Sequence, residues 1–282
     1  MFNRTKEKRR PATKRILGLL AGVALVLGTS VSHAQITGTK HNLGTGGTGA
    51  NHLTAGTAEI CVFCHTPHAS NTAVKAPLWN KPTNGGTYTV YDTSVSTTID
   101  GQVDMKGVSL ACLSCHDGSQ AMDVMINAPG SGGYNAAGAR LVGATWTAAV
   151  GASGLLPVSV ANLGTDLSND HPVGIQYCGG GWSAATSTSS GAGGTCKDPD
   201  FKAPATGTIG GATAWWVDSS VGVTGTREKT DMILYARAPT SFVGNYQPFV
   251  ECASCHDPHS ANATFLRIQN TGSAVCLACH SK

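Results

Sequence analysis

The feature that most constrains this chain is a short motif, Cys-x-x-Cys-His, which occurs four times in 282 residues. Motifs 1 to 4 stand at 61–65, 112–116, 252–256 and 276–280. Together they use eight of the ten cysteines and four of the ten histidines. Because random order would place far less than one such motif in a chain of this composition, the copies indicate one shared chemical task.

The spacing of the motif suits covalent attachment of haem. Two thiols three positions apart can each add to one vinyl group of the same porphyrin, and the next residue offers an imidazole to the iron. We therefore expect four covalently attached haem c groups, haems 1 to 4 in chain order. The attachment residues would be Cys61, Cys64, Cys112, Cys115, Cys252, Cys255, Cys276 and Cys279. The proximal iron ligands would be His65, His116, His256 and His280.

Zinc clips and thioredoxin-like redox pairs are the alternatives, because they also use Cys-x-x-Cys. A histidine directly after each of four motifs, in a chain that carries an export signal, favours haem over both.

The first 34 residues indicate export. Seven basic residues precede an apolar run at 16–27, and small residues follow near Ser32 and Ala34, which is the order found in a signal peptide. An uncleaved membrane anchor is the alternative, but the run is shorter than the ~20 residues that span a bilayer. We expect a signal peptide at 1–34 and a secreted mature chain at the cell surface or in the extracellular space, with the periplasm as the alternative location.

Charge and composition argue against an ordinary helical domain. The leader holds seven of the 19 basic residues and one of the 16 acidic ones, so its removal changes the net charge from +3 to −3. A weakly acidic mature chain does not favour nucleic acid as a partner. Charged residues are 12% of the chain and glycine is 36 of 282 residues, against about 25% and about 7% in average domains. We expect mostly coil, with short helices and few short strands wrapped around a stacked tetrahaem core.

The motifs form two similar pairs in the order A, B, A, B. The similar segments are 61–68 with 252–259, and 111–116 with 275–280. The order suggests a duplication, although the constraints of haem binding alone could produce it. Short helices should carry the motifs and should end early at motifs 1 and 3, because Pro67 and Pro258 disfavour helical geometry in the preceding residue.

These patterns predict a single tetrahaem domain over 35–282. Haems 1 and 2 would lie within 35–128 and haems 3 and 4 within 249–282, while 129–248 would be a haem-free wrapping region.

Weak alternation of residue types favours short strands at 87–91 and 214–217. Cys178 and Cys196 are the two cysteines outside the motifs. In an oxidising compartment we expect them to form a disulfide, with a free reactive pair as the alternative.

Five histidines of the mature chain remain as candidates for a second axial ligand. They are His41, His52, His68, His171 and His259. Methionine is the other common haem ligand, but no methionine of the mature chain has neighbouring residues that mark it as one. Bis-His ligation of all four haems, with low reduction potentials, is therefore the simpler expectation.

Position restricts the choice among these histidines. His68 and His259 follow a proximal histidine by three residues, a reach of at most about 11 Å, so each should bind a haem other than its own. His171 precedes Pro172, which favours an extended backbone there, and a surface loop histidine is the alternative. One of His41 and His52 is spare, and the residues leave that choice open.

Several segments together carry a resemblance. They are 40–43, 61–68, 77–80, 112–118, 169–173 and 252–259. The chain resembles the doubled-CxxCH multihaem c-type cytochromes, and among them the OmcE-like tetrahaem extracellular cytochrome nanowires. The resemblance implies bis-His ligation of all haems, alternating stacked and T-shaped haem contacts, and one distal histidine from the neighbouring subunit. The distal set would then be His41, His68, His171 and His259, with His52 in reserve and His68 donated in trans.

The expected function is extracellular electron transfer by a filament of copies joined head to tail, with other cytochromes or extracellular acceptors as redox partners. A monomeric periplasmic tetrahaem carrier is the alternative. The mature chain has enough ligands for it, but the eight lysines at 35–282 are scattered, whereas such carriers often dock through lysine-rich patches. We do not expect an enzyme, because a catalytic haem needs an iron with an open axial position. The chain has more candidate distal histidines than it has motifs, and none of the four motifs has lysine in place of its histidine.

Overall fold

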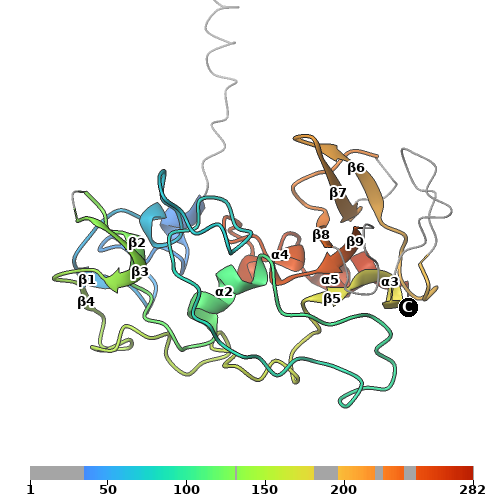
Figure 1. Ribbon diagram of the computed structural model, residues 1–282, viewed down its shortest axis with the longest axis horizontal. Helices are drawn as coiled ribbons and strands as arrows, with labels where there is room; N and C mark the ends of the chain where they lie inside the picture. The colour runs from blue at the N-terminus through green and yellow to red at the C-terminus, as the bar shows by residue number, and fades with distance from the viewer. Residues whose placement is uncertain (1–34, 131, 181–195, 220–224, 238–245, 282) are drawn as a thin grey trace, which may run out of the picture. The chain divides into compact units, whose positions relative to one another are not determined.

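The structure of the chain is a computed structural model. Its fold consists of short helices and strands joined by long loops (Figure 1). The structure describes residues 35–130, 132–180, 196–219, 225–237 and 246–281. The expected signal peptide at 1–34 lies outside these residues. Within the described part of the chain, no helix has the length and apolar character needed to cross a membrane.

Each motif lies on a short helical element. Motif 1 begins on a 3₁₀ helix (η2, Cys61–Phe63), and motif 2 ends α2 (Ser109–His116). Motif 3 lies on α4 (Cys252–Cys255) and motif 4 on α5 (Ala274–Cys279). Helices η2 and α4 end before their histidines, which confirms the prediction made from the two prolines.

The remaining helical elements are single turns. They are η1 (Gln35–Gly38), α3 (Tyr177–Gly180), η4 (Ala263–Phe265) and η5 (Thr271–Ser273).

Two small antiparallel ribbons frame the first two motifs. Strand β1 (Leu53–Ala55) pairs with β4 (Thr145–Trp146), and β2 (Val124–Asn127) pairs with β3 (Tyr134–Arg140). Beneath them lies a hydrophobic cluster, which we call the N-terminal cluster. Its buried members are Leu43, Leu53, Phe63, Met122, Met125, Trp146, Val150 and Leu156, and Cys64 and Cys115 pack against it. Two of the methionines of the chain therefore serve as core residues.

A five-stranded antiparallel sheet occupies much of the second half. Its order is β5 (Ile175–Gln176), β9 (Gln247–Val250), β8 (Met232–Arg237), β7 (Ala212–Val217) and β6 (Ala205–Ile209). The strand predicted at 214–217 is confirmed within β7. The strand predicted at 87–91 is wrong, since Thr89 makes only an isolated bridge to Asp166.

Most of the strands of this sheet lie within 129–248, the expected haem-free wrapping region, where only one of them was predicted. The sequence signal of the sheet is the Gly210-Gly211 turn between β6 and β7, where both glycines adopt positive φ, 58° and 82°. A Gly-Gly pair is a typical two-residue hairpin turn, because its twist matches that of the flanking strands. Alternate residues of β8 are buried, with Met232 and Leu234 facing the core.

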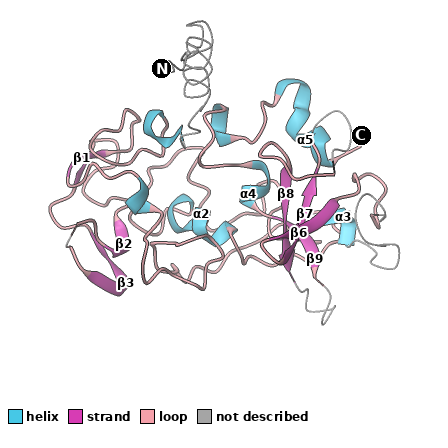
Figure 2. Cartoon of the chain, turned by 90° about the horizontal axis from the view of Figure 1, so that it is seen from above, coloured by secondary structure: helices cyan, strands magenta, loops and turns pink. Residues whose placement is uncertain are grey.

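This sheet supports the last two motifs. Strand β9 leads directly into α4, and β8 packs against α4 (Figure 2). A second cluster, the C-terminal cluster, lies beside the sheet. Its buried members are Tyr177, Cys178, Trp215, Val217, Met232, Leu234 and Ala278, and Cys255 and Cys279 pack against it. Cys178 is disulfide-bonded to Cys196, which confirms the predicted bridge.

Candidate functional site

Motif 1 is held by the segment that follows it. The Asn80 N–H donates to the carbonyl of Cys64 at 2.9 Å. The buried Asn80 side chain donates to the carbonyl of Val62 at 2.7 Å. The ring of His65 places its Nδ1 atom 2.7 Å from the carbonyl of Pro77. This segment therefore orients both the backbone and the imidazole of motif 1.

Motif 2 is fixed from the loop near 160. The His116 Nδ1 atom lies 2.7 Å from the carbonyl of Ala161, and Leu163 returns an N–H to the carbonyl of His116 at 2.7 Å. The next residue, Asp117, is buried and accepts hydrogen bonds from the Tyr88 hydroxyl and the Asn84 amide.

A buried ion pair anchors the start of motif 3. Glu251, directly before α4, is 1% exposed and pairs with Arg237 of β8. Ser109 of α2 donates its hydroxyl to Glu251 and accepts the Cys252 N–H at 3.0 Å. The His256 Nδ1 atom lies 2.8 Å from the carbonyl of Thr264. The elements that carry motifs 2 and 3 are therefore cross-linked through Glu251.

Motif 4 contacts residues that lie close in sequence to the two disulfide-bonded cysteines. The backbone N–H of Lys202 donates to the carbonyl of Cys279 at 2.8 Å, and the buried Tyr177 hydroxyl reaches the same carbonyl at 3.2 Å. The ring of His280 lies against Phe201, with ring centres 4.7 Å apart.

The hydrogen bonds at Nδ1 decide what these rings can bind. A backbone carbonyl can only accept, so the Nδ1 atoms of His65, His116 and His256 must carry the proton. The Nε2 atom is then the free electron-pair donor. This arrangement is usual for metal-bound histidine, and the donor set fits the axial coordination of haem iron.

Two pairs of histidine rings have the spacing that one shared iron requires. The ring centres of His65 and His259 lie 6.2 Å apart with planes at 13°. Those of His41 and His116 also lie 6.2 Å apart, with planes at 75°. Metal–nitrogen bonds of about 2.0–2.1 Å put two axial imidazole centres about 6.3 Å apart. This spacing would allow His259 to share an iron with His65, and His41 to share one with His116, if haem is bound at motifs 1 and 2.

Neighbouring groups influence the protonation of His41 and the orientation of the His259 ring. Burial, followed by the charge of His116, lowers the pKa of His41 to about 4. A neutral imidazole is the form that binds a metal. The His259 Nδ1 atom lies 3.3 Å from Asp257, which directs Nε2 away from that carboxylate. The distance between the His41 and His116 rings therefore favours His41 over His52 as the candidate partner of motif 2.

For His171 and His68, the other two predicted distal residues, the contacts with the motifs are less specific. His171 is exposed, and its Nδ1 atom lies 3.0 Å from the carbonyl of Pro172. Partial desolvation of the ring and, to a smaller extent, the charge of His280 in motif 4 lower the pKa of His171. His68 is exposed and lines a cavity of about 610 Å³. Cys61, His65 and Tyr134 line the same cavity.

The attachment cysteines fall into two groups with one contact between them. Cys64 and Cys115 both pack against the N-terminal cluster, and Cys255 and Cys279 both pack against the C-terminal one. Between the groups, a hydrogen bond from the Cys112 thiol lowers the pKa of Cys252 to about 7. None of the eight motif cysteines forms a disulfide. Within the described residues, no three of the His, Cys, Asp or Glu side chains gather as a metal-ion cluster.

Sequence reasoning overlooked the residues that support the motifs. Ser109, Arg237 and Glu251 lie far apart in the chain, and no local pattern announces their contact. Asp257, which follows His256 directly, could have been noticed as a candidate support for His259 two residues later.

A family model described as doubled CXXCH motif matches residues 247–282, which include motifs 3 and 4. Among curated proteins, none matches the chain. The match supports covalently bound c-type haem and the electron transfer of a multihaem c-type cytochrome. Few short helices and several short strands are compatible with a small protein of that kind.

Proposed function

We propose that the protein carries electrons through four bis-His c-type haems as a subunit of an extracellular filament. Haem, when bound, supplies a one-electron iron couple. The chain supplies eight thiols for attachment, and imidazoles that hold iron on both faces. The doubled CXXCH match supports the general class, and the number of haems and the filament are our extension of it.

The observation that carries the proposal is the contact between α2 and α4, which bear motifs 2 and 3: the Ser109 hydroxyl donates to Glu251 and accepts the Cys252 N–H. Cys64 and Cys115 pack against the N-terminal cluster, and Cys255 and Cys279 pack against the C-terminal one. The contact between α2 and α4 joins those two groups. Each motif therefore has another motif nearby. Haems attached at these motifs would form a series of closely spaced redox centres from motif 1 to motif 4.

The filament rests on the histidines that remain after pairing. His259 and His41 face His65 and His116, and in this proposal His171 is the partner of His280. His256 and His68 are left, and both are exposed. We propose that His68 of one copy binds the iron held by His256 of the next. Such a head-to-tail contact does not close on itself and generates a filament.

A monomeric carrier is the second candidate, and the pairing of His65 with His259 favours it. That pairing joins motif 1 to the histidine that follows motif 3. The reciprocal arrangement would join motif 3 to the histidine that follows motif 1, which is His68, within one chain. Both candidates use the same ligands and differ in which copy supplies His68.

The proposal concerns a carrier and not a catalyst, because an imidazole on each face leaves iron no open position for substrate. It also includes export to the cell surface, with cleavage of the leader, and redox partners that are other cytochromes or extracellular acceptors.

The test is cryo-electron microscopy of untagged protein released from native cells, after mass spectrometry has counted the haems on each chain. Filaments with continuous haem density and a histidine ligand crossing the subunit boundary would support the proposal. Dispersed particles that hold four six-coordinate haems would favour the monomeric carrier. Fewer than four attached haems would contradict both.

A further inference from the structure

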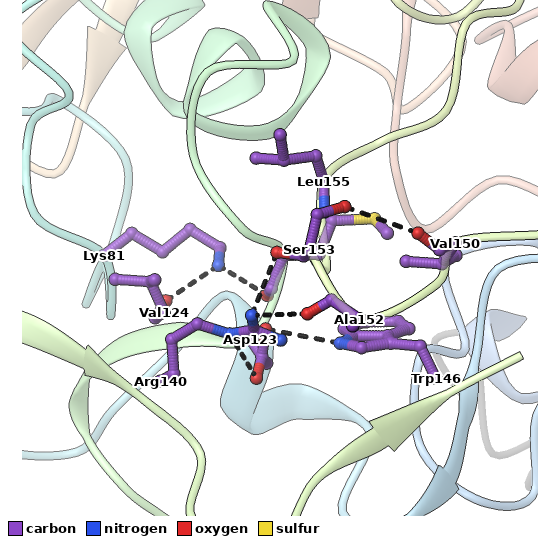
Figure 3. Close-up of polar contacts among 10 residues, drawn as sticks. Lys81, Asp123, Val124, Arg140, Trp146, Val150, Ala152, Ser153 and Leu155 are labelled. Carbon is purple, nitrogen blue, oxygen red and sulfur yellow. Dashed lines mark hydrogen bonds and ion pairs between the residues drawn. The ribbon is translucent and has the colours of Figure 1, made fainter.

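Lys81 is a buried lysine to which the proposed function gives no task. Its side chain is 1% exposed, and its Nζ atom donates to the carbonyls of Met122 at 2.7 Å and Val124 at 2.9 Å (Figure 3). Long charged side chains are almost never fully buried unless they are paired. The acceptors of Lys81 are neutral peptide groups, so they satisfy its hydrogen bonds without cancelling its charge.

The carboxylate in the same region is already paired. Asp123 lies between the two residues that hold Lys81, and its carboxylate is fully buried. Arg140 donates to it at 2.9 Å and the Trp146 indole donates at 3.3 Å (Figure 3). The guanidinium of Arg140 therefore balances Asp123. In the described part of the chain, Lys81 makes no carboxylate contact that would balance its own charge.

The position of Lys81 ties this charge to motif 1. The preceding residue, Asn80, clamps the motif through its bonds to the carbonyls of Cys64 and Val62. The carbonyl that accepts from Lys81 Nζ at 2.7 Å belongs to Met122, a buried member of the N-terminal cluster against which Cys64 packs.

We propose that Lys81 raises the reduction potential of haem 1 by placing a fixed, buried positive charge beside its attachment site. Reduction adds an electron, and a nearby positive charge in a low-dielectric surrounding stabilises the reduced form. Net charge and burial are among the factors that set haem potentials. The inference rests on the proposed function only in requiring a haem at motif 1. It makes Lys81 a tuning residue that binds neither iron nor porphyrin.

The test compares redox titrations of the haem-loaded protein with those of Lys81→Met, which has similar length and no charge. His259→Met identifies the step of haem 1, because methionine ligation raises the potential. In Lys81→Met that step should shift to more negative potential, by more than any other step, while all irons remain low-spin. Lys81→Arg should restore the potential toward the wild-type value.

Lys75→Met is the matched control, since Lys75 is exposed in the loop after motif 1 and solvent screens its charge. Its titration should coincide with that of the wild type. Lys81→Gln guards against misfolding, because its amide can still donate to both carbonyls without a charge.

The outcomes separate the inference from the proposed function. An unchanged haem 1 step in fully loaded Lys81→Met or Lys81→Gln would overturn the role of Lys81 alone. Loss of the motif 1 haem from both variants would make Lys81 a structural residue and overturn it equally. A wild-type protein with no haem at motif 1 would instead contradict the proposed function, and the inference with it.

Discussion

At the scale of single residues, hydrogen bonding at Nδ1 leaves the Nε2 atoms of several histidines free, as the iron ligation that we propose requires. Backbone carbonyls hold His65, His116 and His256 in this way, and Asp257 holds His259. Fixing the proton on Nδ1 leaves Nε2 free and removes a rotational freedom that coordination would otherwise have to overcome. The supporting groups are therefore part of the site, even though they touch no iron.

The His65–His259 pair leads to a prediction for ligation. His259→Ala should leave every haem attached but convert one low-spin iron to high-spin, because the distal face at motif 1 loses its imidazole. Electron paramagnetic resonance measures the change, and added imidazole should reverse it. His52→Ala is the control and should keep all irons low-spin. A low-spin spectrum for His259→Ala would show that another residue serves motif 1.

At the scale of elements, the motif-bearing helices are too short to be stable alone and depend on cross-links. Glu251 is the most connected of these, since it joins α4 to Ser109 of α2 and to Arg237 of β8. Its carboxylate is fully buried. Removing one partner of such a pair leaves the other charge buried without compensation.

Glu251→Ala should therefore lower the free energy of unfolding by about 3–5 kcal/mol, the usual cost of breaking a buried ion pair. Denaturant titration followed by haem absorbance measures this loss. Glu59→Ala, at an exposed site, should change stability by no more than about 0.5 kcal/mol. Equal stability of the two variants would show that Glu251 is not the cross-link we describe.

The disulfide acts on the region that supports motif 4. Cys178 and Cys196 are separated by 18 positions, so the bridge should stabilise the fold by about 3 kcal/mol through the loop that it closes. Cys178→Ser with Cys196→Ser should lower the urea midpoint accordingly. The number of attached haems, measured by mass spectrometry, should stay unchanged. A parallel loss of haem would mean that the bridge is required for attachment itself.

At the scale of the whole molecule, two hydrophobic clusters each support two motifs, and the hydrogen bonds of Ser109 between α2 and α4 connect them. The four motifs therefore belong to one connected arrangement and not to two separate pairs. Such an arrangement is what the proposed electron transfer along the chain requires, and in that proposal the exposed His68 and His256 connect one copy to the next.

His68→Ala should abolish polymerisation while leaving every haem attached, because the iron at motif 3 would lose the ligand that we propose comes from its neighbour. Electron microscopy and sedimentation measure the polymers. His52→Ala is the matched control and should still form them. Filaments of normal length from His68→Ala would rule out this histidine as the link between copies.

The sequence by itself determined where haem can be attached, which cysteines form the disulfide, and where the helices of motifs 1 and 3 end. Each depends on neighbouring residues or on simple counting: a motif of five contiguous residues, two leftover thiols, a proline after the histidine. It could not choose between His41 and His52, and it missed the sheet, whose strands are short and only weakly alternating.

Only the tertiary structure decided which ring faces which. His41 meets His116 and His65 meets His259 across long stretches of chain, and the placement of Lys81 beside motif 1 depends on the carbonyls of residues about forty positions away. Such contacts depend on how the loops close in space. Covalent chemistry can be read from adjacent residues, whereas coordination and electrostatics depend on distances that only the folded chain defines.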